Sequence, residues 1–187
     1  DRLEGRVQAL ARAHDQLTRE EWAPTPLARL LAEELAPYAG EGAHRAPLQG
    51  PDVLITPRAF STLALVFHEL ATNAAKHGAF SAALGQVSVS WRLTADRGLA
   101  IDWVESGGPP VRAPLHRGFG SSFVEKAVPF DLRGEARVDY LFAGLCAHFV
   151  IPAAHVATVR APLPAAAVPA PGRDTVPPRV LLVEDDL

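Results

Sequence analysis

The chain has 187 residues, of which 48% are hydrophobic and 21% charged, and its net charge is −3. This composition indicates a globular domain with a sizeable core and excludes a fibrous or wholly disordered chain. It provides no basic field for nucleic acid, which is therefore not an expected partner. No apolar run is long enough to span a membrane, and the single Cys146 cannot form an internal disulfide, so a reducing, cytoplasmic location is expected.

Three helices are predicted in the first half of the chain. Residues 1–19 have apolar side chains at helical spacing. In "TPLARLLAEELAPY", Thr25 can cap a second helix, Pro26 suits its first position and Pro37 helps to end it. A third helix starts at another Thr-Pro pair and ends near Gly78, a residue type common just after helices.

The second half of the chain has the alternation that is typical of strands. Apolar residues at 87, 89, 91 and 93 alternate with polar ones, and "LAIDWVES", "EARVDYLF" and "LCAHFVIP" are further strand candidates. A short helix is expected over residues 118–128. This order predicts an α+β two-layer sandwich, with helices on one face of a mostly antiparallel sheet.

Polar residues interrupt the third helix in "HELATNAAKHGAFS". Glu69, Asn73 and Lys76 or His77 are spaced to form one stripe opposite an apolar side. Alone, such a stripe is typical of a solvated surface. Two glycine-bearing segments follow it, "DWVESGGPP" and "HRGFGSSFVEKAV". Glycine lets the backbone approach a ligand, and amides at a helix start can hold phosphate.

In this order, the three segments resemble the N, G1 and G2 boxes of the GHKL (Bergerat) ATP-binding domain. "HELATNAAKH" and the Trp-Val-Glu at 103–105 resemble the HWE subfamily of sensor histidine kinases, and "RVQALARAHDQLTREEW" resembles the end of its dimerisation and phosphotransfer region. The resemblance implies an ATP-dependent protein-histidine kinase of a two-component system, with ATP and Mg²⁺ as cofactors. A GHKL ATPase of the chaperone or mismatch-repair class and a non-catalytic nucleotide-binding module remain alternatives.

The resemblance also implies roles for individual residues. Glu69 would polarise the attacking imidazole or position water, Asn73 would bind the Mg²⁺ that bridges the phosphates, and Glu105 would accept a hydrogen bond from the adenine amino group. The other implied nucleotide-binding residues are Lys76, His77, Gly107, Gly118 and Gly120. Core packing is expected for Trp103, and a hydrogen-bonded structural role for His68.

Four regions are expected: residues 1–22 end the dimerisation region, 23–155 form the ATP-binding domain, 156–178 form a Pro/Ala-rich linker, and 179–187 begin a receiver domain. Glu184 and Asp185 resemble the acidic pair of a receiver magnesium site. The implied partners are a receiver domain, within the same protein or separate, and a second copy through the N-terminal helices.

The chain lacks methionine and opens and closes within recognisable patterns, so it is expected to be part of a longer protein. The resemblance locates the phosphoacceptor histidine in a helix upstream of residue 1. His14 is not expected to be the acceptor.

Overall fold

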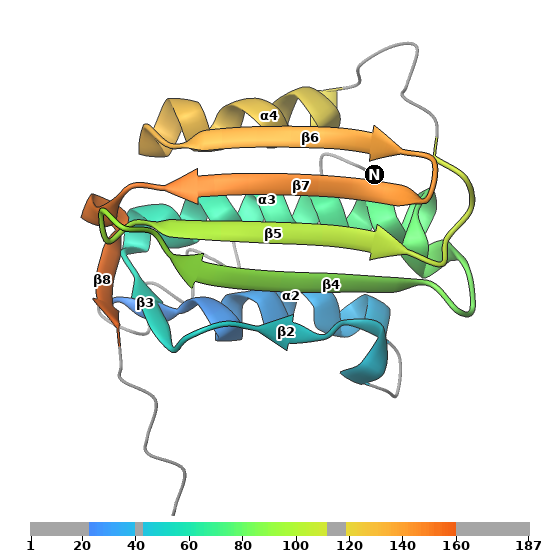
Figure 1. Cartoon of the computed structure of the whole chain (residues 1–187), viewed down its shortest axis with the longest axis horizontal. Helices are drawn as coiled ribbons and strands as arrows, with labels where there is room; N and C mark the ends of the chain where they lie inside the picture. The colour runs from blue at the N-terminus through green and yellow to red at the C-terminus, as the bar shows by residue number, and fades with distance from the viewer. Residues whose placement is uncertain (1–22, 40–42, 112–118, 160–187) are drawn as a thin grey trace, which may run out of the picture.

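Three α-helices cover one face of a five-stranded sheet in the computed structural model, which describes residues 23–39, 43–111 and 119–159 (Figure 1). Neighbouring strands are antiparallel except β2 with β4, which are parallel. The predicted α+β two-layer fold is confirmed. The strand order is β2 (Leu48–Gln49), β4 (Gln86–Leu93), β5 (Leu99–Ser106), β7 (Gly144–Ile151) and β6 (Glu135–Leu141).

A smaller antiparallel sheet pairs β1 (Thr25–Pro26) with β3 (Val53–Ile55), and β3 with β8 (Val156–Val159). Two expectations are wrong here. Thr25 and Pro26 belong to a strand and not to a helix start, and Val156–Val159 are not linker. Both segments find hydrogen-bond partners for their backbone polar groups on β3, which is distant in sequence. Local sequence signals therefore could not predict these two strands.

The second predicted helix is α2 (Leu27–Ala39), which starts just after the Thr-Pro pair and continues through Pro37. A proline inside a helix removes the hydrogen bond to the carbonyl four residues earlier. That carbonyl belongs to Glu33, an exposed residue, so water can reach this part of the helix. The expectation that Pro37 helps to end the helix is therefore wrong.

The central helix is α3 (Pro57–Lys76), and its predicted Thr-Pro start is confirmed. The Thr56 hydroxyl accepts a hydrogen bond from the Ala59 N–H at 3.4 Å, which satisfies one of the free amides of the first turn. At the other end, the His77 N–H donates to the Asn73 carbonyl at 2.8 Å. Helix α3 lies between α2 and α4 behind the sheet (Figure 1).

Aromatic packing fixes α3 against the sheet. Phe67 stacks on Trp103 of β5, with 6.2 Å between ring centroids and 11° between planes, and meets Phe149 of β7 edge-on at 6.1 Å. All three residues are buried. Burial of such large apolar rings is a major stabilising term, so this cluster sets how the C-terminal half of α3 meets β5.

The last helix, α4 (Phe119–Leu132), extends beyond the predicted end at residue 128 and contains Pro129. Its N-terminus, the C-terminus of α3 and the C-terminal end of β5 all lie at the right-hand end of the domain in Figure 1. None of the helices in the described ranges combines the length and apolarity needed to cross a membrane.

Candidate functional site

Glu105 places a carboxylate inside the protein near the end of β5, with only 4% of the residue exposed. Its Oε2 accepts a hydrogen bond from the Ala79 N–H at 2.9 Å, and its Oε1 accepts one from the Trp103 indole N–H at 3.4 Å. A buried carboxylate is costly unless it is hydrogen-bonded. Both oxygens have a protein donor, so Glu105 presents an oriented hydrogen-bond acceptor.

The backbone of Glu105 is held from both sides. On β4, Val87 stands directly opposite it in the antiparallel ladder. On β7, Gly144 lies so close that a Cβ there would collide with the Glu105 carbonyl oxygen. The Glu105 carboxylate can therefore change position only by rotation about its side-chain bonds.

Burial raises the pKa of Glu105 above the usual carboxyl range, while the hydrogen bonds from Ala79 and Trp103 act in the opposite direction. Desolvation disfavours the charged form, and the two donors favour it. Because desolvation is the larger effect, Glu105 gains or loses its proton at a higher pH than an exposed glutamate does.

The segment that follows α3 packs directly on this acid. A Cβ at Gly78 would collide with Glu105 Oε2, and the next residue, at the start of η2 (Ala79–Ser81), donates the amide to the same oxygen. Gly107 has a φ of +68°, and a Cβ there would lie 2.6 Å from the Leu84 carbonyl oxygen. These two glycines allow the end of α3 and the end of β5 to meet.

Arg45, in η1 (Ala43–Arg45), holds the segment after α3 from outside. Its Nε donates to the Gly85 carbonyl at 3.0 Å, and its Nη2 donates to the carbonyls of Ala82 at 2.8 Å and Phe80 at 3.3 Å. The guanidinium also lies 5.4 Å from the centre of the Phe80 ring. One side chain thus restrains the loop that supplies the Ala79 amide.

Arg45→Met is expected to lower the free energy of unfolding by about 2 kcal/mol, because charged hydrogen bonds to three carbonyls are lost while the alkyl chain is kept. Urea unfolding measures the change. Arg92→Met is the matched control, since exposed Arg92 bonds only to Asp102, at 3.0 Å, among the contacts the structure describes. Its cost should stay below about 1 kcal/mol, and equal costs would contradict the role of Arg45.

The polar residues of α3 differ in exposure. Glu69 is buried at 7%, Asn73 is half-buried, and Lys76 and His77 are exposed. A solvated stripe would not bury a glutamate, so the surface interpretation does not hold at Glu69. Glu69, Asn73 and Lys76 lie on the last turns of α3 and His77 caps its C-terminus, so all four lead directly to Gly78, and through Gly78 to Glu105.

The chain resembles known proteins over most of its length. The model of the HWE histidine kinase family matches residues 1–52. The blue-light-activated histidine kinase of Brucella ovis is 35% identical over 150 residues, which make up 79% of this chain and 31% of the relative. The chain belongs to the HWE histidine kinase family. It spans about a third of the length of the curated relatives that it matches.

Solved histidine kinase structures share the fold of this HWE chain. The histidine kinase domain of the Erythrobacter litoralis EL346 blue-light activated histidine kinase has a TM-score of 0.64 at 24% identity, covering 82% of this chain and 76% of that one. The mycobacterial sensor histidine kinase MprB has a TM-score of 0.51 at 18% identity, covering 70% and 97%. At these identities the likeness concerns the fold.

Trp103 and Glu105, the two defined residues of the HWE Trp-X-Glu motif, are hydrogen-bonded to each other. Trp103 is fully buried, which confirms the expected core packing, but its N–H also bonds to Glu105. That bond was not predicted, although residues two apart on a strand face the same side. His68 bonds through Nδ1 to Glu34 Oε2 at 3.1 Å, which confirms a hydrogen-bonded histidine.

The other predicted site residues fall into two groups. Gly118, Glu184, Asp185 and His14 lie outside the described residues. Gly120 lies buried in the first turn of α4. The nucleotide roles of Lys76, His77, Gly107 and Gly120 remain predictions.

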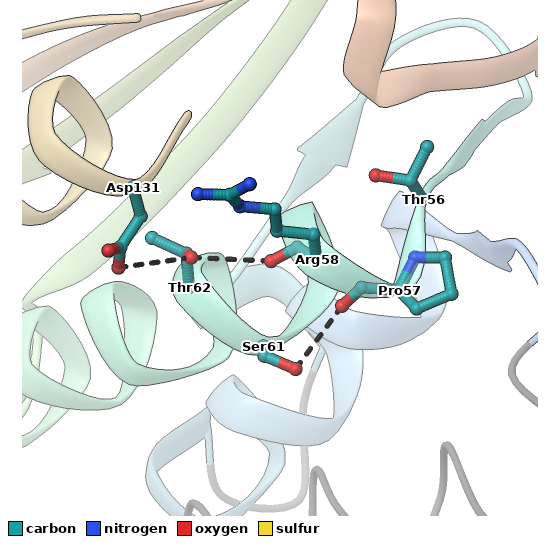
Figure 2. A pocket seen from close by; sticks show the side chains of 6 residues that line it. All are labelled: Thr56, Pro57, Arg58, Ser61, Thr62 and Asp131. Atoms are coloured by element: carbon teal, nitrogen blue, oxygen red, sulfur yellow. Dashed lines mark hydrogen bonds between the residues drawn. The ribbon is translucent and has the colours of Figure 1, made fainter. Parts of the chain in front are cut away.

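A pocket of about 610 Å³ lies elsewhere, at the start of α3 and the end of α4 (Figure 2). In it, Thr62 Oγ1 lies 3.2 Å from the Arg58 carbonyl oxygen and 3.4 Å from Asp131 Oδ2, and its single hydroxyl hydrogen can be donated to either acceptor. The pocket contains none of the predicted site residues and lies at the opposite end of α3 from Asn73. It is lined by Thr56, Pro57, Arg58, Ser61, Thr62 and Asp131.

Proposed function

We propose that this chain is the ATP-binding catalytic region of a sensor histidine kinase, which transfers the γ-phosphate of ATP to a histidine. The observation that carries the proposal is the buried Glu105, with both oxygens hydrogen-bonded, beside the end of a helix that bears Glu69 and Asn73 in an HWE family member. The reaction class and the residue roles are those that the family resemblance implies, and the chemistry of the site supports them.

Glu105 is suited to recognise adenine. An ionised carboxylate accepts hydrogen bonds and cannot donate them, and both oxygens retain accepting capacity beside the two bonds already made. The 6-amino group of adenine is a donor, whereas the 6-oxo group of guanine is an acceptor. Glu105 therefore favours ATP over GTP, because unpaired and repelled polar groups are expensive at a buried position.

Asn73 is suited to the magnesium that accompanies ATP. A side-chain amide oxygen is a hard ligand for Mg²⁺, which commonly takes few protein ligands and completes its shell with phosphate oxygens and water. Within the described residues, no group of three His, Cys, Asp or Glu forms a separate metal centre. A single amide oxygen, that of Asn73, fits a Mg²⁺ ion that arrives with the nucleotide. Bound Mg²⁺ would neutralise phosphate charge.

The remaining predicted residues contact the phosphates, allow the backbone to approach the nucleotide, or act on the attacking histidine. Lys76 and His77 are exposed cations or hydrogen-bond donors for phosphate oxygens, and Gly107, Gly118 and Gly120 allow close backbone approach. Glu69 polarises the attacking imidazole, by accepting a hydrogen bond from its N–H, and so strengthens attack at phosphorus.

The partners follow from the same reaction. The phosphohistidine formed on an upstream helix passes its phosphoryl group to a receiver domain, either a separate one or one that begins at residues 179–187 with Glu184 and Asp185. A homodimer through the N-terminal helices would bring an acceptor helix to the nucleotide. Both proposals, and a cytoplasmic location, rest on family membership and on the sequence.

Glu105→Gln should reduce the preference for ATP over GTP at least tenfold. The glutamine amide can turn its N–H donor towards the 6-position of the purine. This weakens the binding of adenine, whose 6-amino group is also a donor, and allows a hydrogen bond to the 6-oxo group of guanine. Calorimetric titration of Mg²⁺ with each nucleotide measures the ratio. An unchanged ratio would make Glu105 a structural acid only, and absence of ATP binding by the unchanged chain would contradict the proposed function.

The pH dependence provides a second readout for the same variant. Since the ionised acid accepts the adenine amino group and its pKa is raised, ATP affinity should increase as the pH rises through that pKa. The contribution of Glu105 to stability runs in the opposite direction. Because the pKa of Glu105 is higher in the folded than in the unfolded protein, the protonated acid stabilises the fold at a pH below the unfolded-state pKa. This stabilisation is lost as the pH rises through the folded-state pKa. Both effects should be absent in Glu105→Gln.

A further inference from the structure

Trp103 and Glu105 form a pair within one strand. Successive residues of a strand face opposite sides, so residues 103 and 105 both point into the layer between the sheet and the helices. Both are buried, and the indole N–H points its hydrogen at Glu105 Oε1 over 3.4 Å. The indole itself is fixed by stacking on Phe67. The donor is therefore held as rigidly as the core around it.

We propose that Trp103 is a positioning residue for nucleotide selectivity: its indole N–H, together with the Ala79 amide, holds Glu105 as an acceptor of fixed orientation that selects a 6-amino purine. This inference rests on the proposed function, because it assumes that Glu105 faces the purine. It assigns Trp103 a chemical role beyond core packing, without direct contact with the nucleotide.

The need for two donors follows from the geometry of the carboxylate. The backbone of Glu105 is pinned between Val87 and Gly144, so only rotations of its side chain remain. One hydrogen bond, from Ala79, fixes one oxygen but leaves the group free to turn about it. The second bond, from Trp103, removes that rotation. With both in place, the remaining lone pairs point in constant directions.

Side-chain length explains why a glutamate suits this arrangement. Residues two apart on a strand are separated by about 6.6 Å along the chain, and the acid must also reach the Ala79 amide. An aspartate is one methylene shorter, and the pinned backbone cannot move to compensate. Tryptophan at 103 and glutamate at 105 are therefore a matched pair, each suited to the other.

The decisive variant is Trp103→Phe, which keeps an aromatic ring against Phe67 but removes the N–H. The ATP-to-GTP affinity ratio should fall about tenfold, the loss expected for one hydrogen bond to a charged group. GTP affinity itself should change less than threefold, because phosphate and magnesium contacts are untouched. Calorimetric titrations of the full chain with each magnesium nucleotide measure both quantities.

Trp91→Phe is the matched control. Trp91 is also buried on the inner side of the sheet, and its N–H donates to the Pro51 carbonyl at 2.8 Å. It stands four residues along β4 from Val87, the partner of Glu105, which is about 13 Å. Its loss should lower stability while leaving the ATP-to-GTP ratio unchanged. Equal effects of the two variants on the ratio would overturn the inference.

A double-mutant cycle tests whether Trp103 acts through Glu105. In the Glu105→Gln background, Trp103→Phe should change the ATP-to-GTP ratio less than twofold, because the group it orients is gone. A full tenfold effect in that background would overturn the inference and indicate direct contact or general loosening. Binding of ATP with an unchanged ratio in Trp103→Phe would overturn the positioning role alone. Absence of ATP binding by the unchanged chain would contradict the proposed function as well.

A measurement on the unchanged sequence covers the case in which Trp103→Phe does not fold. In chain labelled with ¹⁵N-tryptophan, the Trp103 indole N–H resonance should shift as Glu105 titrates and again when ADP and Mg²⁺ are added. The Trp22 and Trp91 resonances are assigned from Trp22→Phe and Trp91→Phe, which leaves the third resonance as that of Trp103. The Trp91 resonance should not move. A Trp103 resonance that is insensitive to both pH and nucleotide would overturn the inference.

Discussion

Replacement of Asn73 by alanine is expected to weaken binding of Mg²⁺ with ATP about a hundredfold. The variant removes the one amide oxygen on α3 that is suited to the metal, and loss of groups that hold a metal typically costs this order of affinity. Folding should change little, by about 1 kcal/mol or less, because Asn73 is half-buried and alanine favours a helix. Calorimetry and urea unfolding on the same samples separate the two effects.

Thr72→Ala is the control for that experiment. Thr72 is adjacent on α3 and half-buried, but its hydroxyl lies 3.3 Å from the Tyr38 hydroxyl, on the side that faces α2. Its replacement should leave nucleotide affinity within about twofold. If Asn73→Ala binds Mg²⁺ and ATP as tightly as the unchanged chain, the proposed metal contact is wrong.

The second large effect concerns Glu69. In a protein that includes the upstream acceptor helix, Glu69→Ala is expected to reduce formation of phosphohistidine by a factor of about 10² to 10⁴, the range for loss of a general base. Nucleotide affinity should stay within about threefold, because magnesium and adenine contacts are made by other residues. Labelling with γ-³²P-ATP, followed by acid and alkali treatment, identifies the alkali-stable phosphohistidine.

Glu34→Ala provides a matched control, since Glu34 is also a buried acid, with 9% exposure, but bonds to His68 between α2 and α3. It should lose stability and retain phosphorylation. Persistent labelling of Glu69→Ala would remove Glu69 from the reaction. Labelling of the present chain that disappears in His14→Ala would make His14 the acceptor, and rapid ATP hydrolysis without phosphoprotein would favour the ATPase alternative.

Helices and strands with strong periodicity could be predicted because their local signals agree with the final packing. The Thr56-Pro57 start of α3, the alternation in β4 and the Trp-Val-Glu segment of β5 are examples. In each case one face is buried, so hydrophobic spacing and tertiary contact indicate the same element.

Features that depend on distant partners could not be predicted. The strand at Val156–Val159 exists because β3 lies beside it, and the effect of Pro37 depends on the environment of α2. Arg45 has no local pattern that would link it to carbonyls some 40 residues later. The Trp103 hydrogen bond was within reach of sequence reasoning, since strand alternation places Trp103 and Glu105 on one face.

The most direct test of the candidate site is a crystal structure of this chain with ADP and Mg²⁺. The expected result has the adenine amino group within 3.2 Å of a Glu105 carboxylate oxygen, in the usual range for such bonds, and Mg²⁺ coordinated by the Asn73 side-chain oxygen. Trp103 and Ala79 should still donate to Glu105. Nucleotide bound instead in the pocket between Thr56 and Asp131, or with its base away from Glu105, would contradict the site.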